Sequence, residues 1–416
     1  MGTYIFLLLL SALGAPSYGD VTDCEMSSKQ VHYHLRNDLL CDYYSQHRPK
    51  IEHRNATKVY VRMIVQSFSY DAYAGMMNVG SWMPMTWMDD HLQWKPSSYD
   101  DVDLMQLSAS EIWTPDLALY NTYTQSGVQR VLDSGVECLI RNTGKVTCVP
   151  PSQHEAICIA DLRNYPYEKQ KCTLRLGSWV HSGEEIDFQF SNKPVTIDNV
   201  QNGEWKILNV SVERFPGKYG CCPNNTYPSL AFIFSIQRLP SYHEATIIIP
   251  AVVIIIITLS IFFFNAAENE RLYLIIVDVL LHFLFIQNLS WELPKVGDNT
   301  PYILLFARDS LVLCLVQFIT TVILRRTIKI PVDNVGWISG VVGTLIQSRV
   351  GQAILVFDNS VKAVAIAKGD EDGDNIIEKS QGANNVDYVV FATLLDRLLC
   401  AIFLIIYITM FIRFIP

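Results

Sequence analysis

The sequence lacks the residue patterns of an enzyme or of a nucleic-acid-binding protein. No Ser/His/Asp set or metal-ligand constellation stands out, and the scattered histidines His91, His154 and His181 are typical of surface or packing positions. Charged residues make up only 18% of the 416 residues, the net charge is −9, and the basic residues form no stripe. We therefore expect no catalytic activity, no cofactor, no metal and no nucleic-acid partner.

Lys and Arg are also absent from the start of the chain, where an apolar run between Tyr4 and Leu13 is followed by small residues. A run of this length is too short to span a bilayer and is typical of a secretory signal peptide. We expect cleavage between Ala15 and Gly19, so that the mature chain enters an oxidising compartment.

Charge is missing from long stretches of the second half of the chain. Residues 245–264 contain no charged side chain, and a helix of that length covers about 30 Å, the thickness of the hydrocarbon layer. Pro250 is tolerated there because neighbouring helices can satisfy the freed carbonyl. Three further spans are expected at residues 272–293, 302–324 and 388–412. Arg325, Arg326 and Lys329 then lie in the cytoplasm, which places both termini outside.

The second of these spans has two distinct faces. Asp278 and His282 stand four residues apart on one face, where ionisable groups at membrane depth usually point into a helix bundle and pair. We expect a structural contact between them rather than a proton or ion relay. Residues at steps of three and four form another helical face: Tyr273, Val277, Leu280, Leu284 and Asn288.

Cysteine is scarce after residue 222, since eight of the ten cysteines lie between 24 and 222. An even number in an exported segment suits disulfides. Cys138 and Cys148 flank a turn signal symmetrically, so they can face each other across a hairpin. The adjacent Cys221 and Cys222 either bond elsewhere or mark a strained functional loop tip. The other expected bonded cysteines are Cys158, Cys172, Cys24 and Cys41, with the partner of Cys24 left open.

The two remaining cysteines, Cys314 and Cys400, lie in apolar segments and are expected to be buried free thiols. Three acceptor sequons in the first half of the chain predict glycosylation of an exported surface, at Asn55, Asn209 and Asn224.

The sequence pattern of the first half of the chain indicates a soluble β domain. Between residues 56 and 240, short runs rich in Val, Ile, Tyr and Trp alternate with turn residues, which favours an antiparallel sandwich. A helix is expected within residues 28–44. The expected fold is therefore an extracellular antiparallel β-sandwich with an N-terminal helix, followed by a four-helix transmembrane bundle.

Residues 158–172 carry the most specific motif. Thirteen residues separate the two cysteines and include an aromatic-Pro-aromatic-acid core, Tyr165 to Glu168. This segment resembles the signature loop of the Cys-loop, or pentameric ligand-gated, ion channels. Further segments resemble the nicotinic acetylcholine receptor subunits of that family, of a divergent invertebrate type: residues 113–121, 177–179, 219–227, 238–242 and 395–398.

The resemblance implies a ligand site at which Tyr120, Trp179, Tyr219 and Tyr227 form the principal face. Cys221 and Cys222 would form the vicinal disulfide at its tip, and Trp82 would belong to the complementary face offered to a neighbouring subunit. Aromatic faces hold a quaternary ammonium, which cannot donate hydrogen bonds, through their quadrupoles, at up to about 2 kcal/mol each when desolvated. Trp113 is expected to be core instead.

By the same resemblance the second span lines the pore. Glu270 matches the inner acidic ring of cation-selective members, and the Pro-Ala-Arg arrangement of anion-selective members is absent. A ring of carboxylates lowers the barrier for cations. The expected pore-lining set is Glu270, Tyr273, Val277, Leu280, Leu284 and Asn288.

The chain departs from the family pattern at two places. Val180-His181-Ser182 stands where the family usually has Thr-Tyr-Asp. In the pore, Tyr273 and Val277 replace small hydroxyl residues, so five copies would form an apolar constriction that can stop conduction by dewetting. A homopentamer would then be silent, whereas one such subunit among others could still conduct.

The sequence thus predicts an α-like subunit of an acetylcholine-gated, cation-selective pentameric channel, with hetero-oligomeric partners and a lipid environment. The alternative is a non-conducting or modulatory membrane subunit that binds acetylcholine. We expect a multi-pass plasma-membrane protein, with a postsynaptic position as one option. The expected divisions are a signal peptide (1–19), a ligand-binding sandwich (20–240), three membrane helices (241–326), a cytoplasmic loop (327–386), and a fourth membrane helix with an extracellular end (387–416).

Overall fold

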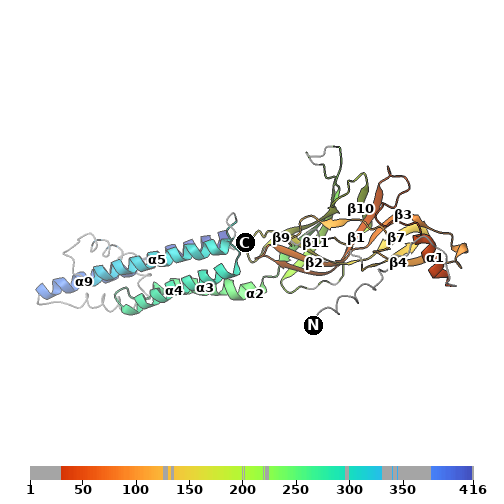
Figure 1. Cartoon of the computed structure of the whole chain (residues 1–416). Coiled ribbons are helices and arrows are strands. Elements are labelled where there is room, and N and C mark those ends of the chain that lie inside the picture. Colours follow the sequence, from red (N-terminus) through yellow and green to blue (C-terminus); the bar gives the residue numbers. More distant parts are fainter. Residues whose placement is uncertain are drawn as a thin grey trace, which may run out of the picture.

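The computed structural model is an elongated molecule with a β domain at one end and a helical domain at the other (Figure 1). It describes residues 30–124, 130–132, 135–198, 200, 202–218, 220, 224–295, 299–329, 340, 344 and 376–414, with side chains in the last segment from residue 388. The expected signal peptide and most of the expected cytoplasmic loop lie outside these residues.

The β domain is a sandwich of two sheets. The eight-stranded sheet follows the order β4-β6-β7-β3-β1-β2-β8, with β10 parallel to β1. Its strands are β1 (Thr57–Asp71), β2 (Met76–Trp82), β3 (Met85–Gln93), β4 (Leu104–Ser108), β6 (Glu137–Arg141), β7 (Thr143–Cys148), β8 (Pro151–Ile157) and β10 (Ile186–Ile197).

The four-stranded sheet follows the order β11-β12-β9-β5. Its strands are β5 (Leu117–Leu119), β9 (Lys169–Ser178), β11 (Trp205–Phe215) and β12 (Ser229–Arg238). Two short helices flank the sandwich, α1 (Val31–Leu40) and the 3₁₀ turn η1 (Pro96–Ser98). The sandwich and the N-terminal helix expected from the sequence are therefore confirmed.

Alternating side chains build the core between the sheets. In β1, Val59, Val61 and Met63 are buried, whereas Lys58 and Tyr60 between them are exposed. This period-two pattern is that of a strand with one face against a core. Trp113 is buried and packs edge-on against Trp87, so its expected core role is confirmed.

Two disulfides with both cysteines in the described part of the chain cross-link the sandwich. Cys138 lies opposite Cys148 in the β6–β7 hairpin, with Cα atoms 4.4 Å apart, as the symmetric spacing predicts. Cys158 bonds Cys172 and closes the intervening loop. Cys41 is also disulfide-bonded, but Cys24 lies outside the described residues.

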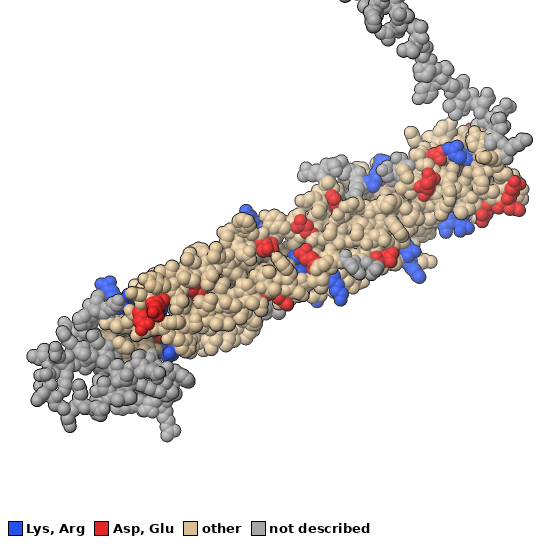
Figure 2. Space-filling view, turned by 90° about the horizontal axis from the view of Figure 1, so that it is seen from below, with Lys and Arg blue, Asp and Glu red and all other residues tan. Residues whose placement is uncertain are grey.

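Within the described residues, four helical segments are long and apolar enough to cross a membrane. On the face shown in Figure 2, charged side chains are scattered over the β domain, are sparse along the middle of the helical half and reappear at its far end. The helices are α2 (Ser241–His243), continued by the π-turn η2 (Glu244–Ile248) and α3 (Ile249–Ile261), then α4 (Asn269–Glu292), α5 (Tyr302–Lys329) and α9 (Ile376–Phe414).

The expected spans are all present, but their ends differ. The first starts at Ser241 and stops at Ile261, and its π-turn lies immediately before Pro250. A proline clashes with the carbonyl four residues earlier, and the wider turn relieves this clash. The last helix begins at Ile376, within the segment expected to be a cytoplasmic loop, so it extends past the apolar stretch that set the expected boundary.

The helices form a bundle with a buried polar interior. Arg271 of α4 makes a buried ion pair with Asp396 of α9. The expected contact between Asp278 and His282 is also present, with 3.6 Å between a carboxylate oxygen and Nδ1 of the imidazole. Burial of Cys314 is confirmed, and Cys400 is a free thiol that is only half-buried.

His154 in β8 predicts how the sandwich responds to acid. Its side chain is 1% exposed, and neither ring nitrogen has a hydrogen-bond partner among the described residues. Burial lowers its pKa from 6.5 to about 4. Between these two values the unfolded chain binds the proton and the folded chain does not, so the free energy of unfolding decreases as the pH falls. The expected loss is about 1.4 kcal/mol per pH unit, about 3 kcal/mol in all.

The measurement is denaturant unfolding between pH 7 and pH 4, followed by tryptophan fluorescence, for the unmodified chain and for His154→Leu. The stability of the unmodified chain relative to that of His154→Leu should fall as the pH falls, since only the unmodified chain loses this contribution. His91→Leu, which removes a surface histidine, serves as the control. A constant difference across the pH range would contradict the prediction.

Candidate functional site

Two aromatic side chains meet at one end of the four-stranded sheet. Tyr120 directly follows β5 and Trp179 directly follows β9, which is paired with β5. Their ring centroids are 6.2 Å apart at an interplanar angle of 66°, and the Tyr120 hydroxyl donates to the Ser178 carbonyl. Trp179 remains 58% exposed, so its ring is open to a ligand.

Asp116 holds the backbone that carries Trp179. One of its carboxylate oxygens accepts hydrogen bonds from the Ser178 hydroxyl and from the backbone N–H groups of Trp179 and Val180, at 2.8, 3.1 and 3.0 Å. Hydrogen bonds to a charged carboxylate are stronger than hydrogen bonds between two neutral groups. The backbone that carries the indole is therefore fixed by the Asp116 carboxylate.

Lys218 and Thr226 form an antiparallel bridge, and Thr226 is bonded to the turn that follows Trp179. Thr226 donates to the Glu184 carboxylate, and the Gly183 N–H donates to the Thr226 carbonyl. Gly217 has a φ of +64°, and a Cβ there would lie 1.7 Å from the Tyr227 carbonyl oxygen, so only glycine fits. Tyr227 is half-buried next to this bridge. The other expected tip residues, Tyr219, Cys221 and Cys222, lie outside the described residues.

The residues that depart from the family pattern line the turn after Trp179. Val180 is exposed, and His181 contacts Glu185 through Nδ1 at 3.1 Å. The Arg175 guanidinium, from β9, lies 5.9 Å from the Tyr120 ring centroid and donates to the Ser229 hydroxyl. The positively charged Arg175 guanidinium thus lies near Tyr120 of the aromatic pair, and no sequence pattern indicated this contact.

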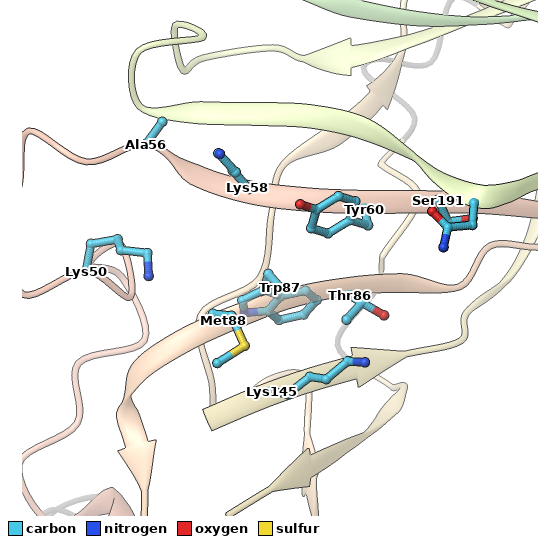
Figure 3. Close-up of a pocket in the computed structure, with 10 residues that line it drawn as sticks. Lys50, Ala56, Lys58, Tyr60, Thr86, Trp87, Met88, Lys145 and Ser191 are labelled. Atoms are coloured by element: carbon cyan, nitrogen blue, oxygen red, sulfur yellow. The ribbon is translucent and has the colours of Figure 1, made fainter. Parts of the chain in front are cut away.

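Trp82 belongs to the other sheet and contributes to a different surface. It ends β2 and is exposed, and on the same outward face Thr86 and Met88 of β3 alternate with buried neighbours. A cavity of about 700 Å³ opens on this sheet between β1, β3, β7 and β10 (Figure 3). Three lysines are among its lining residues, Lys50, Lys58 and Lys145. Within one chain, Trp82 is therefore not brought together with Tyr120 and Trp179.

The loop closed by Cys158 and Cys172 rests on the helical domain. The Tyr165 hydroxyl is hydrogen-bonded to His243 Nδ1 at 2.8 Å, and the Tyr167 hydroxyl donates to the Glu244 carboxylate at 3.1 Å. The backbone N–H of Tyr302, at the start of α5, donates to the carbonyl of Arg163. The loop therefore connects the sandwich to two helices, through Tyr165 and Tyr167 to the first and through Arg163 to α5.

A buried ion pair lies directly above this contact. Arg238, at the end of β12, donates to Glu168 over 2.6 Å, and the two side chains are 4% and 2% exposed. Arg238 also pairs with Glu204 and lies over the Trp205 ring, 4.3 Å from its centroid. Burial raises the pKa of the Glu168 carboxyl, and the Arg238 guanidinium opposes that rise.

The helix α4 presents the expected pore face to the outside of the single chain. Its buried side contains Ile275, Asp278 and His282, which pack inside the bundle. The six residues expected to line a pore are exposed: Glu270, Tyr273, Val277, Leu280, Leu284 and Asn288. When a helix lines a pore at the centre of an assembly, its pore-facing side is not packed against other helices of its own subunit. The exposed face of α4 meets this requirement.

The three expected glycosylation sites are all exposed, at Asn55, Asn209 and Asn224. Asn55 lies in the segment before β1 and Asn209 lies in β11. Each side chain is therefore accessible on the sandwich surface.

Comparison with known proteins identifies the relatives of this fold. The family described as "Neurotransmitter-gated ion-channel ligand binding domain" matches residues 32–240, half of the chain. Similar proteins include the neuronal acetylcholine receptor subunit alpha-5 of Homo sapiens, 27% identical over 67% of this chain and 60% of the relative. Another is the alpha-3 subunit of Rattus norvegicus, 29% identical over 69% of this chain and 58% of the relative. The chain thus spans about three fifths of these relatives.

Proposed function

This chain belongs to the neurotransmitter-gated ion-channel family, and we propose that it is a subunit of a pentameric channel that binds an acetylcholine-like quaternary ammonium and passes cations. The family consists of ion channels, which are not enzymes, and four span-capable helices support a multi-pass plasma-membrane protein. The relatives named above are acetylcholine receptor subunits, which supports this choice of ligand.

The observation that carries the proposal is the preformed contact between Tyr120 and Trp179. The Tyr120 ring stands at an angle to an exposed indole, whose backbone is fixed by Asp116. Together they offer π surfaces to a cation that has no hydrogen bonds to donate. We assign Tyr227, Tyr219 and the Cys221–Cys222 tip to the same principal face.

Trp82 supports an oligomer as the functional unit. Its exposed ring lies on the other sheet, away from the Tyr120–Trp179 pair of its own chain, so it serves a site shared with a neighbouring subunit. The outward face with Trp82 and the lysine-lined cavity is then the complementary face. The partners are other family subunits in a hetero-oligomer, surrounded by lipid.

The remaining assignments concern the membrane. We propose that residues 20–240 are extracellular, that residues 241–326 and the fourth helix span the bilayer, and that both termini lie outside. The end of α9 supports this orientation, because Phe414 contacts Tyr302 at the junction with the sandwich (Figure 1). Glu270 would form the acidic ring that favours cations, and a postsynaptic membrane is the proposed site of action.

A non-conducting subunit that binds acetylcholine is the second candidate. It is favoured by one observation, the large apolar side chains of Tyr273 and Val277 on the exposed face of α4. Such a subunit would keep the aromatic site and modulate its partners without contributing to conduction. Both candidates require the aromatic site, so its ligand binding is tested first.

Trp179→Ala should weaken the binding of a radiolabelled cholinergic ligand by about 30-fold, because one desolvated cation–π contact contributes up to about 2 kcal/mol. Binding is measured on intact cells that express the chain with a conventional nicotinic partner, at matched surface levels. Tyr44→Ala is the control, since Tyr44 is an exposed aromatic on the same domain. Equal affinities for Trp179→Ala and the unmodified chain would exclude this site.

A further inference from the structure

A cluster of three potential metal ligands is buried between two membrane helices. Asp278 and His282 lie one turn apart on α4, and Cys314 lies on α5, which runs alongside α4 (Figure 1). All three side chains are buried, and one ligand atom of each lies within 4.8 Å of the others. Cys314 stands far from the other two in the chain, so no local sequence pattern indicates the cluster.

Two of the separations between the ligand atoms match those of a tetrahedral zinc site, one to each oxygen of Asp278. Nδ1 of His282 lies 3.6 Å from Oδ1 of Asp278, and Sγ of Cys314 lies 3.3 Å from Oδ2 of Asp278. Zinc bonds of about 2.0 Å to oxygen or nitrogen and about 2.3 Å to sulfur place tetrahedral ligands about 3.3–3.7 Å apart. To share one ion, the His282 ring must give up its 2.8 Å hydrogen bond from Nδ1 to the Asp278 carbonyl.

One atom of the cluster lacks a partner. Oδ1 of Asp278 is buried and has no hydrogen-bond partner among the described residues, although Thr258 and Cys314 both donate to Oδ2. A carboxylate at membrane depth is costly unless its charge is compensated. A divalent ion bound by this carboxylate and the Cys314 thiolate would make the cluster electrically neutral.

The surrounding groups can orient the ligands. Nε2 of His282 is 2.8 Å from the Ser310 hydroxyl, which in turn lies 2.9 Å from the Tyr407 hydroxyl. In the structure, Nδ1–H of His282 donates to the Asp278 carbonyl oxygen. For a metal to take Nδ1, the ring must switch to its other neutral tautomer, with the proton on Nε2, where it can be donated to the Ser310 hydroxyl, an arrangement that metal-bound histidines commonly use.

We propose that Asp278, His282 and Cys314 form a binding site for a zinc-like divalent ion inside the transmembrane bundle of each subunit. Thiolate, imidazole and carboxylate ligands together favour Zn²⁺ over the hard cations Mg²⁺ and Ca²⁺. Binding releases the proton of the Cys314 thiol and joins α4 to α5. The site is independent of the ligand pocket and of the assignment of the pore.

The test uses the full chain purified in detergent, stripped with a chelator and titrated with Co²⁺ and then Zn²⁺. We expect about one Co²⁺ per chain, with the sulfur-to-cobalt charge-transfer band and the strong visible bands of tetrahedral coordination, and displacement by Zn²⁺. Cys314→Ser should abolish the charge-transfer band, and Asp278→Asn should weaken binding at least tenfold. Cys400→Ser is the matched control, since Cys400 is the other free thiol in the described part of the chain.

The absence of a charge-transfer band in the unmodified protein would overturn the proposal and leave the cluster as a hydrogen-bonded network. Loss of the band in Cys400→Ser with its retention in Cys314→Ser would also overturn it. A zinc-dependent rise in the melting temperature of the unmodified chain, but not of Cys314→Ser, is expected from linkage. Size-exclusion profiles of each variant exclude misfolding as the cause of a lost signal.

Discussion

Glu168→Gln should leave ligand binding in place and reduce the agonist-evoked current by more than about tenfold. The substitution removes the buried one of the two carboxylates that compensate Arg238 where the sandwich joins the membrane helices. Removing one partner of a buried ion pair costs about 3–5 kcal/mol, because the other charge remains buried. The Cys158–Cys172 loop, which holds Tyr165 and Tyr167 against the first membrane helix, would lose its fixed position.

The matched control is Glu204→Gln. Glu204 also pairs with Arg238, but its side chain is 53% exposed, so water compensates for its loss and the expected effect is small. Radioligand binding, surface expression and whole-cell current are measured for both variants. A full current from Glu168→Gln, or equal losses of current in both variants, would contradict a role for this pair in transmitting ligand binding to the pore.

Tyr273→Ser combined with Val277→Ser should turn a silent homopentamer into a conducting one. Both side chains lie on the exposed face of α4, and five copies of each would form an apolar ring that excludes water. Serine side chains are small, and their hydroxyls hydrogen-bond to water, so water can occupy the constriction. We expect ligand-evoked current in cells that express the double variant alone and none in cells that express the unmodified chain alone.

Ile276→Ser is the control for this experiment. Ile276 is exposed on the same helix but lies outside the expected pore line, so its replacement should leave the homopentamer silent. Current from the unmodified chain alone would show that Tyr273 and Val277 do not close the pore. Silence of the double variant at normal surface expression would remove these residues from the conduction path.

Patterns among residues that are close together in the sequence predicted most of the fold. The strand alternation around Val59 and Val61, the cysteines symmetric about the β6–β7 turn and the apolar spans are local properties of the chain, and each has the expected counterpart in the structure. The ends of the helices were predicted less well. Pro250 shifts the first helix through a π-turn, and α9 continues beyond the apolar residues that a hydropathy pattern detects.

The candidate site was predicted through its aromatic residues but not through their supports. Tyr120 and Trp179 stand in motif segments, and the structure brings them into contact. Asp116 lies in one of those segments, yet its bonds to the Trp179 backbone depend on the pairing of β5 with β9. Arg175 and Cys314 matter through contacts between segments that are distant in sequence, which no local pattern indicates.

The most direct test of the channel proposal is whole-cell current under acetylcholine, recorded from cells that express the chain with a conventional nicotinic partner. The partner alone and the chain alone are recorded in parallel. We predict an acetylcholine-evoked cation current in the combined cells that differs in amplitude or reversal potential from that of the partner alone. Combined cells with surface expression and retained cholinergic binding, but no current beyond that of the partner, would contradict the channel proposal and favour the non-conducting subunit.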